Sequence, residues 1–198
     1  MVAPASELDG FVEPDWHAPL DARAALRLIP ESATITGMFI KPAADAVLAK
    51  GSQMPAAHET YHGFRHYPLR VHAEMLLEAC RVVYGHLPLR IALRKLGRAA
   101  PKALLNSTLG KVTLGSTSGV HAALRTMGEM YPVNVRCCTT QTLDSGDHHY
   151  VLRLKQLYYF LDSHHVGAME GAMRYAGAEG QVRLRSTGPL EIDFLCTW

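Results

Sequence analysis

The stretch VNVRCCTTQTLDSGDHHYVLRLKQLYYF, residues 133–160, decides the fold class. Before Pro132, apolar residues recur at helical spacing, whereas in this stretch apolar and polar residues alternate with a period of two. The sequence DSGD at 144–147 interrupts the alternation with residues typical of turns. The pattern therefore predicts a β-hairpin whose strands flank residues 144–147.

A helix and a second strand pair are predicted after the hairpin. Asp162 or Ser163 is a suitable N-cap for the helix, and Gly177 is suited to its C-terminal end. QVRLRST and LEIDFLCTW then alternate around a turn that contains Gly188, and Asp193 faces outward, where Arg185 could pair with it. This predicts a strand-strand-helix-strand-strand unit with an antiparallel sheet.

The residues before the hairpin are predicted to be helical. Residues 1–20 contain three prolines and no apolar period, so they read as an irregular N-terminal arm. Residues 21–198 then form a single α+β domain, with N-terminal helices preceding the sheet. Apolar residues at helical spacing predict helices at 37–50, 69–84, 88–105 and 117–130, with Pro101 kinking or ending the third and Tyr131-Pro132 closing the fourth.

Length and composition indicate a globular protein. The chain has 198 residues, of which 48% are hydrophobic, and its formal net charge is +2. No apolar run is long enough to span a membrane, and the acidic N-terminus does not resemble a signal peptide. The four cysteines lack the spacing of a zinc or disulfide framework. We therefore expect a cytoplasmic protein.

Basic residues are concentrated in the middle of the chain. Residues 79–128 hold eight bases and no acid. Within them Arg90, Arg94, Arg98 and Lys102 recur every four residues, which places them on one flank of the predicted helix. Such a flank could bind an anionic ligand or an acidic partner protein. Nucleic acid is a weaker prediction because the overall charge is small. The alternative is a solvated face, or one that docks on the acidic N-terminal part of the same chain.

The segment HETYHGFRH, residues 58–66, contains the zincin pattern. In a zincin, His58 and His62 would bind zinc from one helix and Glu59 would activate a water molecule. Pro55 and Gly63 oppose a rigid helix here. We expect a surface tract and no zinc, and keep a zinc-dependent hydrolase as the alternative. The pairs His148-His149 and His164-His165 are likewise expected to have surface or capping roles.

Several blocks resemble a known family. They are TGMFIKP, YPLRVHAEMLLEA, LPLRIALRKLGRAAPKALLNSTLGKV, YYFLDSHHVGAMEGAMRYAG and GPLEIDFLCTW. They resemble a domain-of-unknown-function family found mainly in myxobacteria, over about residues 35–198. The resemblance implies a bacterial regulatory protein and no established activity.

The predicted architecture is also similar to haem-nitric-oxide-binding domains and to vinyl-reductase-like small-molecule-binding domains. In the haem family the ligand histidine lies seven residues before a Tyr-Pro, where this chain has Leu124. His121 lies one turn away, out of register. Of the haem family's Tyr-x-Ser-x-Arg motif only Tyr150 is present, so we expect no haem. The resemblance implies a pocket near His121, Leu124, Met127, Tyr131 and Tyr150.

The sequence as a whole favours a non-catalytic regulatory domain that senses a small molecule. Methionines within the predicted helices suit a pocket for a small hydrophobic ligand. The alternatives are the zinc-dependent hydrolase and a protein-interaction module that uses the basic helix face.

Overall fold

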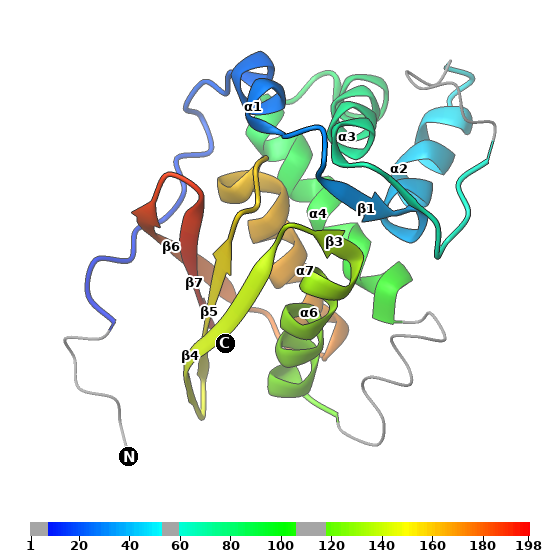
Figure 1. Ribbon diagram of the computed structural model, residues 1–198. Coiled ribbons are helices and arrows are strands. Elements are labelled where there is room, and N and C mark those ends of the chain that lie inside the picture. The colour runs from blue at the N-terminus through cyan, green and yellow to red at the C-terminus, as the bar shows by residue number, and fades with distance from the viewer. Residues whose placement is uncertain (1–7, 53–59, 106–117) are drawn as a thin grey trace.

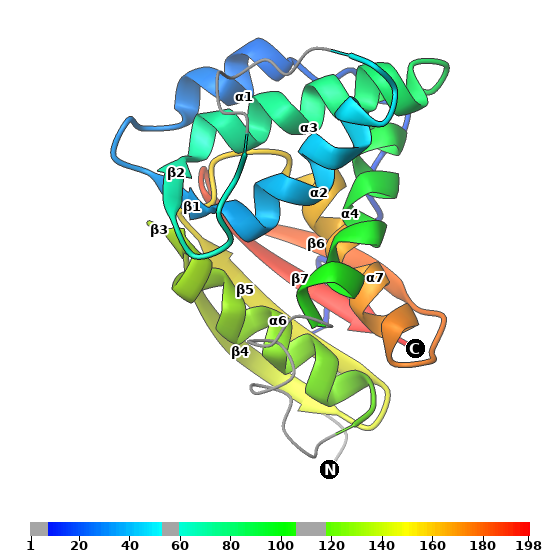
Figure 2. The same ribbon diagram turned by 90° about the vertical axis from the view of Figure 1, so that its right-hand side faces the viewer.

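The computed structural model describes residues 8–52, 60–105 and 118–198. It has the α+β architecture that the sequence predicts, with helices at one end and a sheet covered by further helices at the other (Figures 1 and 2). The described elements are α1 (Ala22–Leu28), β1 (Thr34–Thr36), α2 (Gly37–Leu48), β2 (His66–Pro68), α3 (Leu69–Tyr84), α4 (Leu89–Leu105), α6 (Val120–Asn134), β3 (Val135–Arg136), β4 (Thr139–Gly146), β5 (His149–Lys155), the π-helical turn η2 (Leu161–His165), α7 (Val166–Tyr175), β6 (Gln181–Gly188) and β7 (Glu191–Thr197).

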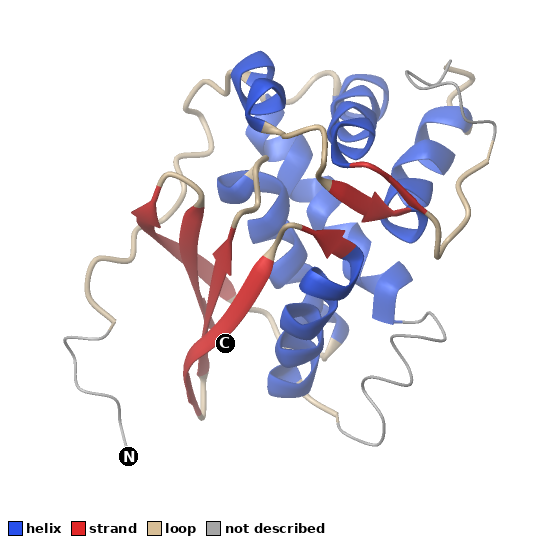
Figure 3. Cartoon of the chain, viewed as in Figure 1, coloured by secondary structure: helices blue, strands red, loops and turns tan. Residues whose placement is uncertain are grey.

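The main sheet contains four antiparallel strands in the order β4-β5-β7-β6 (Figure 3). β4 and β5 form the predicted hairpin, in which Gly146 pairs with His149. β5 then pairs with β7 along its length, with Leu152 opposite Phe194. Both side chains are buried in the main core, on the sheet face that α6 and α7 cover (Figure 2).

The outer face of the sheet carries a buried ion-pair cluster. Arg185 pairs with Asp193 at 2.9 Å, as the strand pattern predicts, and Arg153 pairs with the same carboxylate at 2.6 Å. However, Asp193 is completely buried rather than outward-facing in solvent. Burial raises its pKa, but the two guanidinium groups more than offset this, and the net pKa lies below its usual value.

Short elements and proline positions are where the structure departs from the predictions. The small sheet β2-β1-β3 and helix α1 were not predicted, because segments of two to seven residues carry too little periodicity. α4 continues past Pro101 to the predicted end at Leu105, so this proline does not end it, whereas α6 continues past Pro132 to Asn134, beyond its predicted end. A proline removes one backbone hydrogen bond, a loss that the packing of these helices outweighs.

Helices α4 and α7 pack with their backbones in contact. A β-carbon at Gly97 of α4 would collide with the carbonyl oxygen of His164. A β-carbon at Gly167 or Gly171 of α7 would collide with a carbonyl oxygen of α4. The three glycines therefore hold the residues at the start of α7 directly against α4.

Residues 8–20 run along the edge of the sheet beside β6 (Figure 1) and then contact α4. Val12 pairs with Leu184 of β6, and each of their two backbone hydrogen bonds is 2.8 Å long. Phe11 packs on the outer sheet face, and the Trp16 ring lies 4.0 Å from the Arg94 guanidinium. In the described part of the chain, no helix has the length and apolarity that crossing a membrane requires.

Candidate functional site

A cluster of buried histidines and tyrosines lies where the helical end meets the sheet. His72 comes from α3, Tyr131 from α6, Tyr159 from the segment after β5, and His164 and His165 from η2. The Tyr159 hydroxyl lies 2.8 Å from His72 Nδ1, and the Tyr131 hydroxyl lies 2.8 Å from His165 Nδ1. The His164 ring lies between the other two imidazoles, with centroid distances of 6.0 Å to His72 and 5.2 Å to His165.

The local backbone explains why two consecutive histidines both point inward. Phe160 adopts a left-handed conformation with φ of 48°, and the chain then forms the π-helical turn η2 before α7 begins. The His165 amide reaches back to the Phe160 carbonyl at 3.4 Å. Non-glycine residues with positive φ and π-helical turns are both enriched at functional sites.

This geometry corrects the expectation that His164 and His165 have surface or capping roles. Their exposed fractions are 6% and 3%. They are buried because the three glycines bring η2 and α7 against α4 on one side, while α3 and α6 contribute residues on the other.

Burial keeps the three imidazoles uncharged. It lowers the pKa of His72 to about 3 and that of His164 to about 4, and it lowers the pKa of His165 well below its ordinary value. Burial also raises the pKa of both tyrosines. At neutral pH the cluster therefore contains hydrogen-bonding groups and no charge.

Two ring nitrogens of the cluster have no hydrogen-bond partner among the described protein atoms. They are Nδ1 of His164 and Nε2 of His165, and both are buried. A buried polar atom without a partner costs about 1–3 kcal/mol, so its retention calls for an explanation. A bound molecule that supplies the missing hydrogen bond is one such explanation.

Two cavities adjoin the cluster. The smaller has a volume of about 20 Å³ and the larger about 200 Å³. Phe39, His72, Ala100 and His164 line both of them. The smaller is also lined by Ile35, Met127, Tyr131, Val135, Tyr159, His165 and Ala168, and the larger by Pro42, Ala43, Ala46, Leu76, Val83, Tyr84, Leu96 and Ala99.

The structure places the pocket residues that were predicted from sequence in different parts of the molecule. Met127 and Tyr131 line the smaller cavity. Leu124 is fully buried but lines neither cavity. His121 and Tyr150 lie elsewhere: the His121 ring is 4.8 Å from the Trp198 ring, and the Tyr150 hydroxyl is 2.6 Å from the Thr142 hydroxyl. The prediction missed His72, Tyr159, His164 and His165, although the adjacent histidines were noted.

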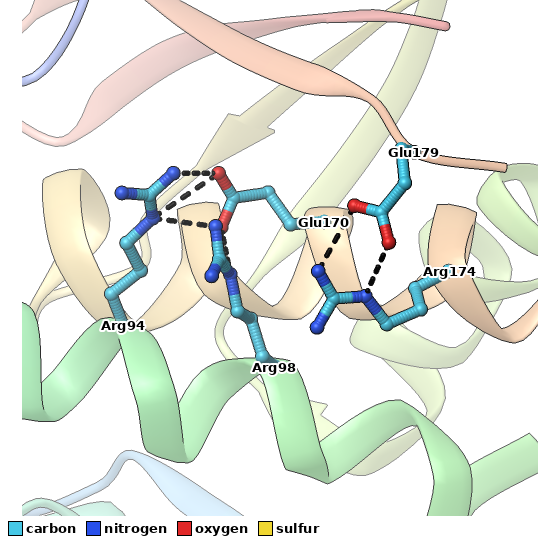
Figure 4. Close-up of polar contacts among 5 residues, drawn as sticks. All are labelled: Arg94, Arg98, Glu170, Arg174 and Glu179. Atoms are coloured by element: carbon cyan, nitrogen blue, oxygen red, sulfur yellow. Dashed lines mark hydrogen bonds and ion pairs between the residues drawn. The ribbon is translucent and has the colours of Figure 1, made fainter.

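Three of the four cations of the predicted basic helix face pair with acids of the same chain, two of them with one shared carboxylate (Figure 4). Arg94 and Arg98 both pair with Glu170 of α7, and Arg90 pairs with Asp162. Arg94 and Arg98 therefore lie against α7 rather than on a fully solvated face, because Glu170 is only 6% exposed. The alternative of docking within the chain holds, but the acid comes from α7 rather than from the N-terminal part. Lys102 is exposed.

The zincin pattern is only partly described. His58 and Glu59 lie outside the described residues. His62 is exposed and belongs to a non-helical segment, whereas the motif needs both histidines on one helix. Across the described ranges, no three His, Cys, Asp or Glu side chains are placed to hold a metal ion.

Acidification is expected to destabilise the fold through the buried histidines. Each ring has a folded pKa below its unfolded value of about 6.5, so below that pH the unfolded chain binds more protons. The stabilisation is complete above about pH 6.5 and is lost as the pH falls, by up to about 1.4 kcal/mol per pH unit for each ring. Urea unfolding at pH 7, 6 and 5 measures this slope. A His72→Gln variant should show a shallower slope, and equal stability at pH 7 and pH 5 would contradict the prediction.

Comparison with known proteins gives a family and a fold. A family model described as "Protein of unknown function (DUF2378)" matches residues 28–198. None of the curated proteins compared with the sequence matches it.

Solved structures of H-NOX proteins match most of the chain. An Fe(II) unliganded H-NOX protein from K. algicida has 12% identity and a TM-score of 0.60, over 82% of this chain and 96% of that one. An Fe(II)NO H-NOX protein from S. oneidensis has 10% identity and a TM-score of 0.63, over 82% and 98%. An oxygen-binding H-NOX domain related to soluble guanylate cyclases has 10% identity and a TM-score of 0.58, over 81% and 91%. At these identities the likeness concerns the fold alone.

Proposed function

Because the chain belongs to the DUF2378 family and has an H-NOX-like fold, we propose that it is a non-catalytic domain that senses a small, mostly apolar molecule. The ligand occupies the larger cavity, between α2, α3 and α4. The observation that carries the proposal is the pair of buried, unpartnered imidazole nitrogens in the cluster beside this apolar cavity. A ligand that fills the cavity and reaches the cluster would satisfy both features.

The composition of the cavity supports an apolar ligand. Its lining includes aliphatic and aromatic side chains from three helices, and its polar groups are those of His72, His164 and Tyr84. Binding sites typically combine such an apolar wall with a few polar groups that orient the ligand. The described residues of the lining include no Lys, Arg, Asp or Glu, so a charged ligand would lose its hydration without compensation from them.

The described residues do not fit a haem held in the way that the haem family implies. Leu124 occupies the ligand position, and Leu152 and Leu154 stand where that family has serine and arginine. All three leucines are fully or almost fully buried. The larger cavity, of about 200 Å³, is also below the roughly 300–1,000 Å³ of common ligand sites. The proposal therefore assigns no step to haem.

Helix α4 offers a route from ligand to response. Leu96, Ala99 and Ala100 of α4 line the larger cavity, while Arg94 and Arg98 on another flank pair with Glu170 of α7. A ligand that shifts α4 would also shift these pairs and Trp16, whose ring lies against Arg94. Differential contact of this kind is what a sensor needs in order to change a population of states.

Filling the cavity by mutation should abolish ligand binding. Ala100 lines both cavities, so Ala100→Leu places three additional carbon atoms where a ligand would sit. Toluene is a suitable probe, because a dry apolar cavity of about 150 Å³ is enough for benzene. Toluene at saturating concentration should raise the melting temperature of the parent protein and leave that of Ala100→Leu unchanged.

Ala49→Leu is the matched control, because Ala49 is exposed just beyond α2 and lines neither cavity. It should respond to toluene as the parent protein does. Failure of the parent to bind toluene, benzene or p-xylene by calorimetry would overturn the proposal. A stoichiometric Soret band after expression with added haem would show that the ligand is haem and not a small apolar molecule.

A further inference from the structure

The N-terminal segment, residues 8–20, fills a surface on the outer face of the sheet beside β6 (Figure 1). Its Phe11 side chain is buried there against Val151 and Leu195, which point away from the main core. The matched family region begins at residue 28, so the segment lies outside it. The chain therefore adds to the family's domain a segment that covers one surface of the sheet.

Arginine side chains of the domain hold this segment at three points. Arg185 donates to the Asp9 carbonyl at 3.1 Å, and its guanidinium lies 4.4 Å from the Phe11 ring centroid. The other two contacts are those of Arg94 with the Trp16 ring, at 4.0 Å, and of Arg90 with the Ala18 carbonyl, at 3.0 Å. Residues 8–20 carry three carboxylates and no Lys or Arg, so the charge of the segment is opposite to that of the side chains that hold it.

The backbone of the segment pairs with β6 at a single position. Val12 and Leu184 exchange two hydrogen bonds of 2.8 Å, and this is the one pair that the described residues form on this edge of β6. In the same antiparallel register Val182 lies opposite Pro14, which has no N–H to donate, and the two residues line a small cavity of about 80 Å³. On the other side Gly10 has a φ of 81°, which is not a strand conformation. The segment therefore leaves part of the edge of β6 unused.

We propose that the outer sheet face and the edge of β6 form a groove for an extended acidic peptide of a partner protein, and that residues 8–20 occupy this groove as an internal competitor. The partner peptide places an aromatic ring where Phe11 lies, and its backbone continues along β6 beyond Leu184. In this mode of recognition backbone hydrogen bonds supply affinity and side-chain pockets supply specificity. The groove lies outside the ligand cavity, so the proposal does not depend on the proposed function.

The contacts of the segment are few enough for it to open while the domain stays folded. Phe11 is the one buried residue among residues 8–20, and Val12 is 64% exposed. None of the buried members of the main core belongs to the segment, so its release removes no buried side chain from that core. Parts of a protein with few buried apolar contacts open at a lower free energy than the whole domain.

Hydrogen exchange in the parent protein tests whether the segment opens by itself. The Leu184 amide, which donates to the Val12 carbonyl, should exchange at least about tenfold faster than the amides of β7, which is paired on both sides. Equal protection would overturn the proposal, because the segment would then leave only when the domain unfolds.

A fluorescent peptide of residues 8–20 tests the groove. The full-length Phe11→Ala/Val12→Pro variant loses the buried ring and one of the two hydrogen bonds to Leu184, so its own segment competes poorly. By anisotropy, the peptide should bind this variant at least about tenfold more tightly than the parent, in which the tethered segment competes at an effective concentration in the millimolar range. Phe64→Ala is the matched control, because Phe64 is 78% exposed and holds no part of the segment, and it should bind the peptide as weakly as the parent. Equal binding by the parent and the double variant would contradict the proposal.

Changes within the peptide identify the chemistry that the groove recognises. Pro14→Thr supplies an N–H for the Val182 carbonyl, so this peptide should bind the double variant about five- to tenfold more tightly, which corresponds to one net hydrogen bond. Replacing the three carboxylates with amides should weaken binding at least about threefold at low salt. Equal affinity in the first comparison would rule out pairing along β6, and equal affinity in the second would rule out an acidic partner.

Two measurements on the parent protein complete the test. Sedimentation should give a monomer, and a dimer that dissociates in the double variant would overturn the assignment, because residues 8–20 would then fill the groove of a second copy. If the double variant does not fold, the ¹⁵N-labelled parent keeps the proposal testable. The Pro14→Thr peptide at millimolar concentration should shift the amide signals of Val182 and Leu184, and unchanged signals would refute the groove.

Discussion

Gly97→Ala is expected to lower the free energy of unfolding by about 3 kcal/mol or more, although alanine is the better helix former by about 1 kcal/mol. Gly97 lies inside α4, where its α-carbon faces the backbone of η2. An added β-carbon would overlap the carbonyl oxygen of His164 and approach the amide nitrogen of Ala168 to 3.0 Å. Backbone atoms cannot rotate away as a side chain can, so α4 and α7 would have to separate.

The separation should also impair binding, because it moves the turn that carries His164. Urea unfolding measures the stability, and calorimetry with p-xylene measures the site. Gly128→Ala on α6 is the matched control. Its β-carbon would meet the Leu152 side chain, whose nearer methyl group at 3.1 Å can move by a few tenths of an ångström. Equal stability of the two variants would show that α4 and α7 are not held by backbone contact.

The part of the fold that was predicted from sequence is the part with long, regular patterns. Alternation in LEIDFLCTW predicted a strand and its pairing with the preceding one, and the structure confirms that Arg185 pairs with Asp193. Helical spacing after Pro68 predicted α3, which begins at Leu69. These patterns reflect the burial of one face of an element, so they can be recognised without knowing which other elements pack against that face.

The candidate site depends on backbone conformations and on contacts between distant segments, which a local sequence pattern does not reveal. His164 and His165 are adjacent, and a regular surface helix would give them no common role. They become a cluster because of the left-handed conformation at Phe160, the π-helical turn after it, and the glycine on α4 that admits this turn. The signal that the sequence offered was two histidines followed by Val166-Gly167, within a segment rich in small residues.

The basic helix face likewise shows that the sequence predicts where charged residues lie on a helix but not which residues they pair with. The spacing of Arg94 and Arg98 correctly placed both on one flank of α4, as their shared partner shows. The sequence did not reveal that Glu170, more than seventy positions away from either, would lie against that flank. A charge run is therefore informative about geometry and uninformative about exposure until its partners are known.

Glu170→Gln is expected to destabilise the protein by about 2 kcal/mol. Glu170 is almost completely buried, and both arginines that it binds are about one quarter to one third exposed (Figure 4). Burial raises the pKa of Glu170, but the two arginines more than offset this, so the net pKa lies below its usual value and the carboxylate is charged at neutral pH. In the variant a neutral amide replaces the carboxylate, so the two neighbouring guanidinium groups repel each other without an anion between them. The cost is below the 3–5 kcal/mol of a fully buried pair because solvent screens the arginines.

Glu179→Gln is the matched control. Glu179 also binds an arginine, Arg174 of α7, at 3.0 Å, but both partners are exposed. Its substitution should leave urea unfolding unchanged, since exposed pairs contribute little. The two variants should also respond differently to salt, because 1 M sodium chloride screens surface charges and affects a buried pair much less.

The Glu170 variant also tests whether α4 couples the pocket to the N-terminal segment. Trp16 stacks on Arg94, so release of Arg94 should change the fluorescence of Trp16 when it is observed in a Trp198→Phe background. If the pocket and this ion-pair cluster act through one helix, p-xylene should change Trp16 fluorescence in the parent and less so in Glu170→Gln. An unchanged signal in the parent, at a concentration where calorimetry shows saturation, would mean that α4 does not transmit binding to Trp16.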